Sequence, residues 1–317
     1  MGLIDRLFHS HRVPDMPGLQ AAVERAVDLV EPRLKLAGGY PDRYREPVAH
    51  ALAYCQTLAA QVPGPIAVNR EAYARDPLVH ALFPSVDEIR AAMCVSQAMR
   101  DFRKTYPYAT DVYALMGMRR RESKVFGMEM QGETLKRDVP QEVVYFADHT
   151  LADPAPSEVE ARERIAIGFF DSLMAHVAER MMARRGERAE LEIEKAKLLD
   201  DLHGASAEAR PALENQLREL LSRSQSLQQL LDLRQYGEDF MAVLMAPERY
   251  LYLERTAISL DGMGVRRAGQ DGEEIQFCDL IGRDRRRWTV TMVHCGNVLG
   301  EVTLSERLAT GQRWLGL

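Results

Sequence analysis

Arginine, the side chain best suited to binding phosphate, is concentrated in short stretches of this chain. Its guanidinium is planar and can donate two parallel hydrogen bonds to one phosphate group. The stretches with the clearest clustering comprise Arg119, Arg120, Arg121 and Lys124, and later Arg283, Arg285, Arg286 and Arg287. We treat these residues as candidate anion-binding residues. The alternative interpretation is that each stretch is a solvated turn, or pairs with acidic side chains of the same chain.

The overall charge limits what such a site could bind. The chain has 41 Lys+Arg residues against 47 Asp+Glu residues, a formal net charge of -6 and an isoelectric point of about 5.8. Proteins that hold nucleic acid with their whole surface are usually basic. Binding of a nucleotide or a nucleic acid would therefore have to be local to an arginine cluster.

Metal-ligating side chains gather at one place, where His149 follows Asp148 and Asp153 is close in sequence. Carboxylates and imidazoles bind divalent metals, but neighbouring residues of a strand point to opposite faces, so Asp148 and His149 are expected to diverge. The four cysteines are scattered and form no C-x-x-C pair, which favours free buried thiols. The sequence therefore predicts no metal site, no cofactor and no disulfide framework, and the catalytic residues of any enzyme stay unknown.

Residues 258–265, with the sequence ISLDGMGV, resemble the serine–glycine turn of PilZ domains, which bind cyclic dinucleotides. The resemblance covers this segment alone. Ala257 stands where the family has an acidic or amide residue, two positions before Ser259. The arginine pair expected upstream is missing, and Arg283 and Arg287 have its spacing but follow the turn. No binding residue is therefore carried over from that family.

The elements that must position these residues begin with a helical N-terminal domain over 1–106. Apolar residues recur at three- and four-residue spacing over 18–36, and a second helix is expected to begin at Pro47. Ser85 and Glu88 form a capping box for a helix that should reach about Lys104.

A central antiparallel β-meander is expected over 107–152, where alternation of apolar and polar residues replaces the helical period. Charge interrupts the alternation at Glu122, so we place a turn there. This register sets Gly117 opposite Gly127 and puts the first arginine stretch at a hairpin tip.

Residues 157–246 predict a long antiparallel, coiled-coil-like helical hairpin, opened by a capping box of Ser157 and Glu160. Its seam positions alternate by three and four residues on both sides of a turn near Gly204. They include Ile167, Phe170, Met174, Val177, Met181, Leu191, Leu198 and Leu202 in the first helix, and Leu213, Leu217, Leu220, Ser224, Leu227 and Leu231 in the second. Arg184 and Arg188 also fall on the seam, where buried charge is costly unless it is paired.

The last part, 247–317, is expected to form a β-rich C-terminal domain with strands over 250–260, 275–281 and 288–295. The predicted fold class is therefore α+β and mainly helical. It combines the N-terminal helical domain, the central antiparallel β-meander, the long helical hairpin and the β-rich C-terminal region.

These features favour a non-enzymatic binding or scaffolding protein that acts through the helical hairpin and the β surfaces. Its expected partner is another protein or a second copy of the chain. One alternative is a protein that binds a phosphate-bearing anionic ligand, a nucleotide or a nucleic acid, through the arginine clusters. Another is an unrecognised enzyme. With neither a signal segment nor an apolar stretch long enough to be transmembrane, the sequence predicts a cytoplasmic protein.

Overall fold

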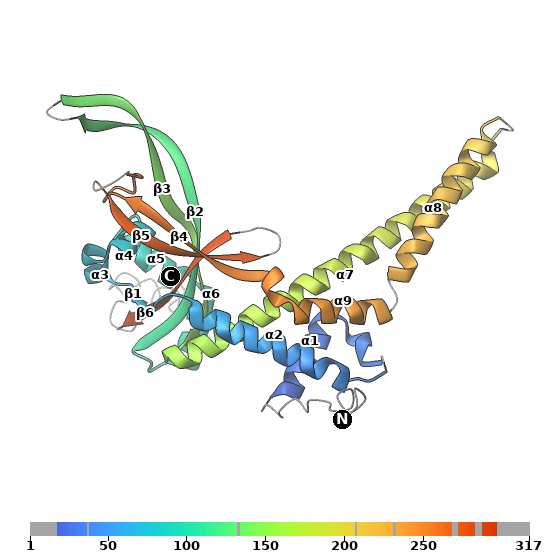
Figure 1. Ribbon diagram of the computed structural model, residues 1–317, viewed down its shortest axis with the longest axis horizontal. Helices are drawn as coiled ribbons and strands as arrows, with labels where there is room; N and C mark the ends of the chain where they lie inside the picture. The colour runs from blue at the N-terminus through green and yellow to red at the C-terminus, as the bar shows by residue number, and fades with distance from the viewer. Residues whose placement is uncertain are drawn as a thin grey trace, which may run out of the picture. The chain divides into compact units, whose positions relative to one another are not determined.

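The computed structural model describes residues 18–36, 38–131, 134–206, 208–230, 233–267, 272–282 and 287–296. It combines helices with an antiparallel sheet (Figure 1). The contacts divide the chain into a first unit, Met1–Cys55 with Phe169–Tyr250, and a second unit, Gln56–Gly168 with Leu251–Leu317. Helices α2 (Asp42–Gln61) and α7 (Glu158–Gly204) contribute residues to both units. The division into four sequence ranges stays a prediction.

The first unit is helical. Besides parts of α2 and α7 it contains α1 (Leu19–Val30), the 3-10 helix η1 (Pro32–Leu36), α8 (Arg210–Leu230), α9 (Leu233–Met245) and η2 (Pro247–Arg249). Its core includes Tyr44, Phe170 and Phe240, all fully buried, with the rings of Tyr44 and Phe240 5.3 Å apart. Ion pairs add to this packing, because Arg25 on α1 contacts Asp171 on α7.

Exposure along α7 and α8 follows the heptad positions predicted from the sequence. Between residues 181 and 202 the less exposed positions are Met181, Arg184, Leu191, Lys195, Leu198 and Leu202. In α8 they are Leu213, Leu217, Leu220 and Ser224, and the side chains at 227–230 lie outside the described part. Leu191 and Leu220 share one small buried cluster, with Leu198 packed against it. Two predicted seam positions of α7 do not follow this pattern, because Arg188 is exposed and Ile167 is 48 % exposed.

The second unit is built on one sheet with the strand order β3-β2-β6-β5-β4. These strands are β2 (Asp111–Gln131), β3 (Thr134–Ala155), β4 (Leu251–Leu260), β5 (Glu273–Gly282) and β6 (Arg287–Gly296). Neighbours in this order are antiparallel, and the short β1 (Ile66–Ala67) pairs with β6 in parallel. The three strands expected after residue 247 are confirmed, and they join the central strands in the same sheet.

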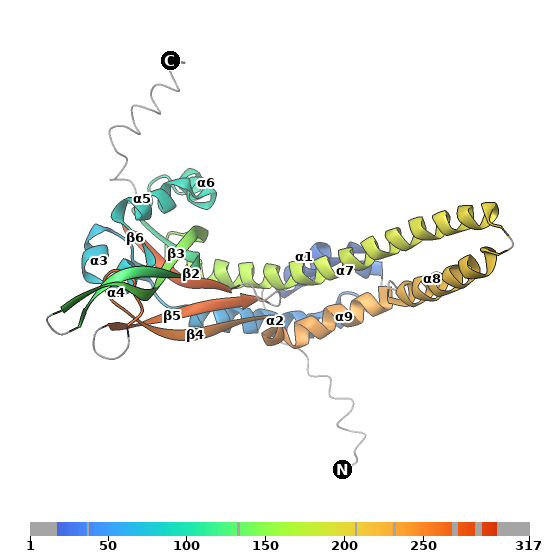
Figure 2. The ribbon, with the colours of Figure 1, turned by 90° about the horizontal axis from the view of Figure 1, so that it is seen from above.

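The sheet curls around its core. Phe146 on β3 and Phe277 on β5 have ring centroids 5.1 Å apart, although β2 and β6 lie between these strands in the order. Val265, beyond the end of β4, forms a bridge with Val143 on β3. Four helices contribute side chains to this core, and Figure 2 shows these helices beside the strands. These helices are α3 (Arg70–Arg75), α4 (Pro77–Leu82), α5 (Val86–Val95) and α6 (Gln97–Thr105).

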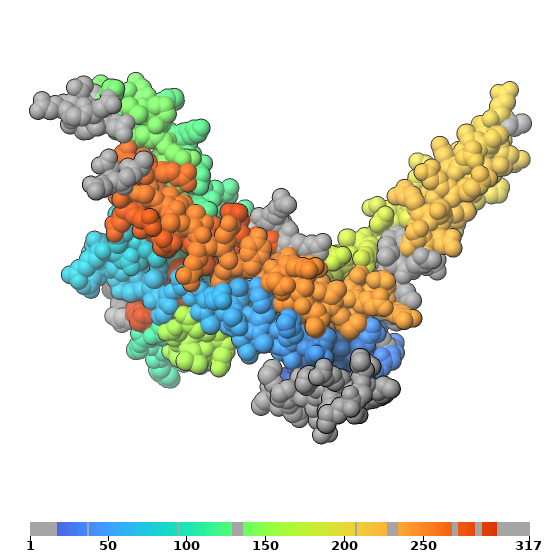
Figure 3. Space-filling model, in the orientation of Figure 1, coloured from blue at the N-terminus to red at the C-terminus, as the bar shows by residue number. Residues whose placement is uncertain are grey.

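The turn expected at Glu122 is wrong. β2 continues from Asp111 to Gln131 and pairs with β3, so Gly117 lies opposite Thr150 and Gly127 opposite Val139. Pairing of β2 with β6 ends at Met118, beyond which β2 and β3 continue as a ribbon, drawn in green in Figure 3. Beyond Met118, β2 no longer pairs with β6, and Arg119, Arg120 and Arg121 pair with acids of β3 and β5, so charged residues interrupt the alternation inside a continuous strand.

Three β-bulges bend β3. The register between β2 and β3 shifts three times, and each shift falls at an aspartate with positive φ: Asp138 (59°), Asp148 (57°) and Asp153 (54°). A residue in the left-handed region is typical of one class of bulge, and aspartate tolerates that conformation better than most residues. Because bulges increase the local twist, they explain the curvature of the long ribbon in Figure 1.

The bulge at Asp138 gives a testable expectation, because its side chain is exposed and its backbone is left-handed. Asp138→Gly should leave the free energy of unfolding unchanged or raise it by up to about 1 kcal/mol, since glycine adopts positive φ without strain. Asp138→Val should lower it by about 1–2 kcal/mol, since a β-branched side chain is strained there. Urea unfolding followed by tryptophan fluorescence measures both; equal effects of glycine and valine would contradict the bulge.

Both predicted capping serines are confirmed, each through the hydrogen bond that its hydroxyl accepts. Ser85 Oγ accepts a hydrogen bond from Glu88 N at 3.2 Å, and Ser157 Oγ accepts one from Glu160 N at 3.3 Å. The helix expected from Ser85 to about Lys104 is instead two helices, α5 and α6, because Ser96 caps a new start between them.

The start expected for the second helix is also wrong. α2 begins at Asp42 and holds Pro47 in its interior, at the loss of one helical hydrogen bond. Within the described ranges, no helix is both long and apolar enough to cross a membrane.

Candidate functional site

The first arginine stretch lies within β2, where successive side chains alternate between the faces of the strand. Arg119 and Arg121 both approach Asp148, at 3.8 and 3.5 Å. Arg119 also lies over the ring of Trp288 on β6, 5.0 Å from its centroid, in a cation–π contact. Lys124 is exposed further along the ribbon.

Of the second stretch, Arg287 is described, and it opens β6 next to Trp288, the residue that Arg119 contacts. Arg287 pairs with Glu254 on β4 at 3.1 Å. Arg283, Arg285 and Arg286 lie outside the described residues. An anion at Arg119, Arg121 or Arg287 would have to compete with a carboxylate of the protein, so the assignment of these residues to anion binding stays a prediction.

Arg120 points to the other face and forms a buried ion pair. Its Nη2 lies 2.9 Å from Oδ2 of Asp279 on β5, whose side chain is 1 % exposed. Thr289 on β6 donates a hydrogen bond from Oγ1 to the other carboxylate oxygen of Asp279 at 2.7 Å. These contacts connect β2, β5 and β6 at the point where β2 stops pairing with β6, so we assign Arg120, Asp279 and Thr289 a role in stabilising the sheet.

The arginines of α7 within the first unit contact other helices. Arg184 pairs with Asp239 on α9 at 2.5 Å, which supplies the partner that a charge on the seam requires. Arg185 contacts Glu31, a carboxylate that is only 4 % exposed, and lies over the ring of Tyr236. Arg188 is exposed.

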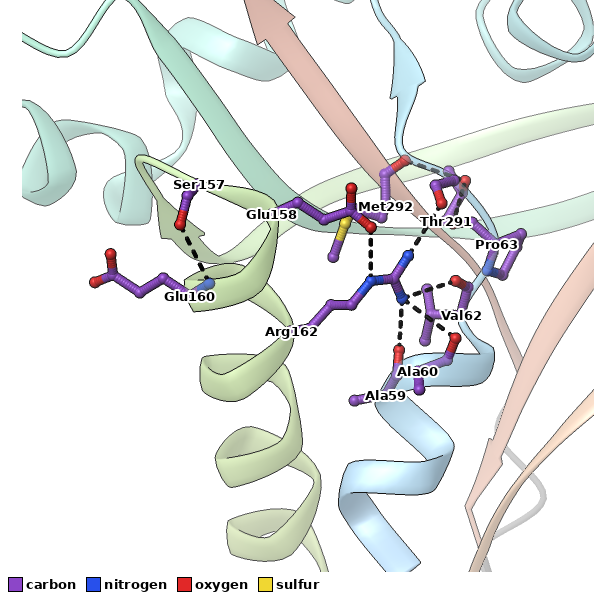
Figure 4. A network of polar contacts seen from close by, with 11 residues as sticks. Ala59, Ala60, Val62, Pro63, Ser157, Glu158, Glu160, Arg162, Thr291 and Met292 are labelled. Atoms are coloured by element: carbon purple, nitrogen blue, oxygen red, sulfur yellow. Dashed lines mark hydrogen bonds and ion pairs between the residues drawn. The ribbon is translucent and has the colours of Figure 1, made fainter.

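Arg162, on the first turns of α7, is the centre of a network of polar contacts (Figure 4). Its Nη1 donates to the carbonyl oxygens of Ala59 (2.9 Å), Val62 (3.2 Å) and Ala60 (3.4 Å), its Nη2 to Gly64 O (3.0 Å) and its Nε to Glu158 (2.9 Å). The acceptors include carbonyls at the C-terminal end of α2, which lack partners inside the helix. Arg162 therefore holds the end of α2 against the start of α7.

His80, His149 and His294 of the second unit each form a polar contact within that unit. His149 Nε2 lies 2.8 Å from Leu82 O, and its ring stacks on Phe83. His80 Nε2 lies 3.0 Å from Gly262 O. His294 pairs with Asp111 at 2.8 Å and stacks on Tyr113. Each imidazole thus contacts an acceptor of the same unit.

The segment that resembles the PilZ turn begins in the last residues of β4, and its Gly264 and Val265 contact β3. Asp261 accepts hydrogen bonds from Val265 N and Met263 N and from Arg267, and these outweigh burial to lower the pKa of Asp261. Beside this turn lies a pocket of about 990 Å³, which is lined by α3, α4, β3 and the turn. Two polar side chains in its wall form hydrogen bonds within the protein, because His80 contacts Gly262 O and Tyr73 donates to Pro84 O.

The described thiols are buried and resist ionisation. Burial raises the pKa of Cys55 and of Cys295 to about 12 each, and it also raises the pKa of Cys278. Because the thiolate is the reactive form, these thiols are poor nucleophiles at neutral pH.

We expect Cys55, Cys278 and Cys295 of the folded protein to resist a disulfide reagent at pH 8, and all four cysteines to react in urea. The reason is that the raised pKa keeps the folded thiols protonated, whereas an unfolded cysteine has its usual pKa of about 8.5. Peptide mapping by mass spectrometry measures each site separately. Rapid modification of Cys55 or Cys295 without urea would contradict this burial.

The spacing of Glu158 and Arg162 predicts their ion pair, which is confirmed, but sequence reasoning did not identify the carbonyl contacts of Arg162, the pair of Arg120 with Asp279, or the pocket. The signal for Arg162 was present as an Arg four residues after Glu158 in the first turn of a capped helix, but its carbonyl partners are far away in sequence.

Comparisons with protein-family models, with curated proteins and with solved structures found no match.

Proposed function

We propose that this protein is a non-enzymatic binding module that acts through an antiparallel helical hairpin formed by α8 and the distal half of α7. The observation that supports this proposal most is the pattern of exposure between residues 181 and 224. Apart from Arg188, the described positions predicted as a seam are less exposed than the residues between them. The shared cluster of Leu191, Leu198 and Leu220 supports an antiparallel pairing of these helices (Figure 2). In that pairing Leu198 packs beside Leu213, and Lys195 beside Leu217.

The proposed hairpin has an outer face that its own seam does not use. On this face Met182 is 67 % exposed and Ile193 is 71 % exposed. Apolar side chains that recur along one face of a charged helix favour a contact with another protein. A protein partner therefore fits this surface better than a small anion does.

The alternatives receive less support from the contacts of the candidate residues. Arg119, Arg120, Arg121 and Arg287 each approach a carboxylate of the same unit, which weakens the case for a phosphate ligand. The described histidines near the pocket contact backbone carbonyls, and the buried thiols have raised pKa values. These arginines, histidines and thiols take part in contacts that stabilise the fold, so the binding module remains our conclusion.

The test places a photo-crosslinking amino acid, p-benzoylphenylalanine, at Ile193 of the full chain in cells. We expect a discrete adduct with one protein species, identified by mass spectrometry. The matched control places the same group at Glu187, which is exposed on another side of α7. Adducts at neither position, or the same adducts at both, would contradict binding through the outer face.

A further inference from the structure

The outer face of α7 is a continuous stripe of apolar and small residues. Met182, Gly186, Ala189, Ile193 and Ala196 follow one another at alternating four- and three-residue steps, and all are exposed. Such spacing keeps them on one side of the helix, roughly opposite the covered positions Leu191 and Leu198. The stripe is therefore separate from the surface that faces α8.

No contact within the described part of one copy of the chain accounts for a glycine at position 186 of this stripe. Glycine inside a helix costs about 1 kcal/mol relative to alanine. The other interior helix glycines have a packing reason, because an added Cβ would lie 2.8 Å from Asp153 Oδ2 at Gly168 and 2.9 Å from Tyr44 Oη at Gly237. At Gly186, among the described residues, nothing lies within 4 Å of such a Cβ. A glycine in open space is what the close approach of a second helix requires.

We propose that this stripe joins two copies of the chain through antiparallel packing of their α7 helices, with the two-fold axis near Ala189. This inference rests on the proposed function and names its partner. In this arrangement Ile193 of each copy packs over Gly186 of the other, and Met182 packs over Ala196. The large exposed side chains thus meet the small ones, which is the complementarity that close helix packing needs.

The charges beside the stripe fit the same arrangement. An antiparallel two-fold pair brings the same flank of both helices together. It therefore places Glu179 of one copy near Lys197 of the other, and Arg185 near Glu192, with each contact made twice. All four side chains lie at exposed positions. Arg185 already contacts Glu31, and its side chain is still 45 % exposed.

The first experiment measures sedimentation of the full chain from about 1 to about 100 µM, the range in which a modest helix interface associates. The wild type should shift from monomer to dimer. Gly186→Leu should raise the dissociation constant at least about tenfold, because leucine fills the site of closest approach. Its melting temperature should not fall, since the added side chain meets open space and leucine favours helix. Ala183→Leu, off the stripe, is the control and should leave the dimer unchanged.

Charge reversal tests the direction of packing. Glu179→Lys and Lys197→Glu should each weaken the dimer about threefold, and the double variant should restore it, since the pairs are exposed and individually weak. Ala189→Cys should form a disulfide between copies on a non-reducing gel, and Glu187→Cys should not.

The outcomes separate this inference from the proposed function. A wild type that stays monomeric to about 100 µM, with no disulfide at Ala189→Cys, overturns self-association. If the crosslinker at Ile193 still captures a different protein, the binding module stands without the dimer. If it captures no protein, both are wrong.

Discussion

Asp279→Ala is expected to lower the free energy of unfolding by about 3 kcal/mol, because it removes the closest carboxylate from the mostly buried charge of Arg120. Of the described acids, Arg120 then keeps only Glu122, which lies 3.8 Å away and is 41 % exposed. The Arg120 side chain is 14 % exposed and that of Asp279 is 1 % exposed, so water cannot replace the lost carboxylate. Thr289 would lose its acceptor as well. Urea unfolding followed by tryptophan fluorescence reports on this region, because Trp288 lies on β6 next to Thr289.

The chain supplies a matched control for this variant. Glu254 lies directly opposite Asp279 in the pairing of β4 with β5, and it too pairs with an arginine, Arg287. Both partners of that pair are about half exposed, so Glu254→Ala should cost less than about 1 kcal/mol. A triple variant with Arg120→Leu, Asp279→Leu and Thr289→Val should recover most of the loss, since apolar residues replace the whole group. Equal losses for Asp279→Ala and Glu254→Ala would contradict the burial of this ion pair.

Arg162→Ala is expected to lower the free energy of unfolding by about 2–4 kcal/mol, because carbonyl groups of Ala59, Val62 and Gly64 lose a charged donor together. The segment after α2 cannot easily find another arrangement. An added Cβ at Gly64, where φ is +102°, would lie 2.3 Å from Met292 O. Arg162→Lys should retain little of the stability, since one ammonium group cannot reach acceptors spread across the planar fork.

Glu158→Ala separates the ion pair of Arg162 from its carbonyl contacts. The pair spans one helical turn and its side chains are partly exposed, so this variant should cost only about 0.5 kcal/mol. Chemical unfolding of the three variants under one set of conditions makes the comparison. A loss at Glu158→Ala as large as at Arg162→Ala would show that the carbonyl contacts contribute little.

Local signals in the sequence predicted much of the fold. The capping serines Ser85 and Ser157 and the strands after residue 247 were placed correctly, because caps and alternation depend on residues close in sequence. The turn at Glu122 failed because a change from buried to exposed strand produces the same break in alternation as a turn. The bulges at Asp138, Asp148 and Asp153 gave no signal distinguishable from ordinary aspartates in a loop.

The candidate site was less predictable, since it depends on contacts between distant residues. Three consecutive arginines suggested one anion site, yet the strand sends Arg120 to the core and its neighbours to Asp148. The acids that meet them come from β3 and β5, and sequence spacing alone does not reveal such pairings. Gly186 became informative only when its surroundings were known to be open.

The pairing of α8 with α7 is the central claim, and one distance tests it most directly. Two ketone-bearing amino acids at Glu190 and Leu221, both exposed, can carry nitroxide labels without altering the native thiols. An antiparallel pair places these positions at the same level with helix axes about 8–10 Å apart. Pulsed electron resonance should then give a narrow distance distribution below about 30 Å, allowing for the label arms. A distance above about 40 Å, as for helices that continue in one direction at about 1.5 Å per residue, would contradict the hairpin.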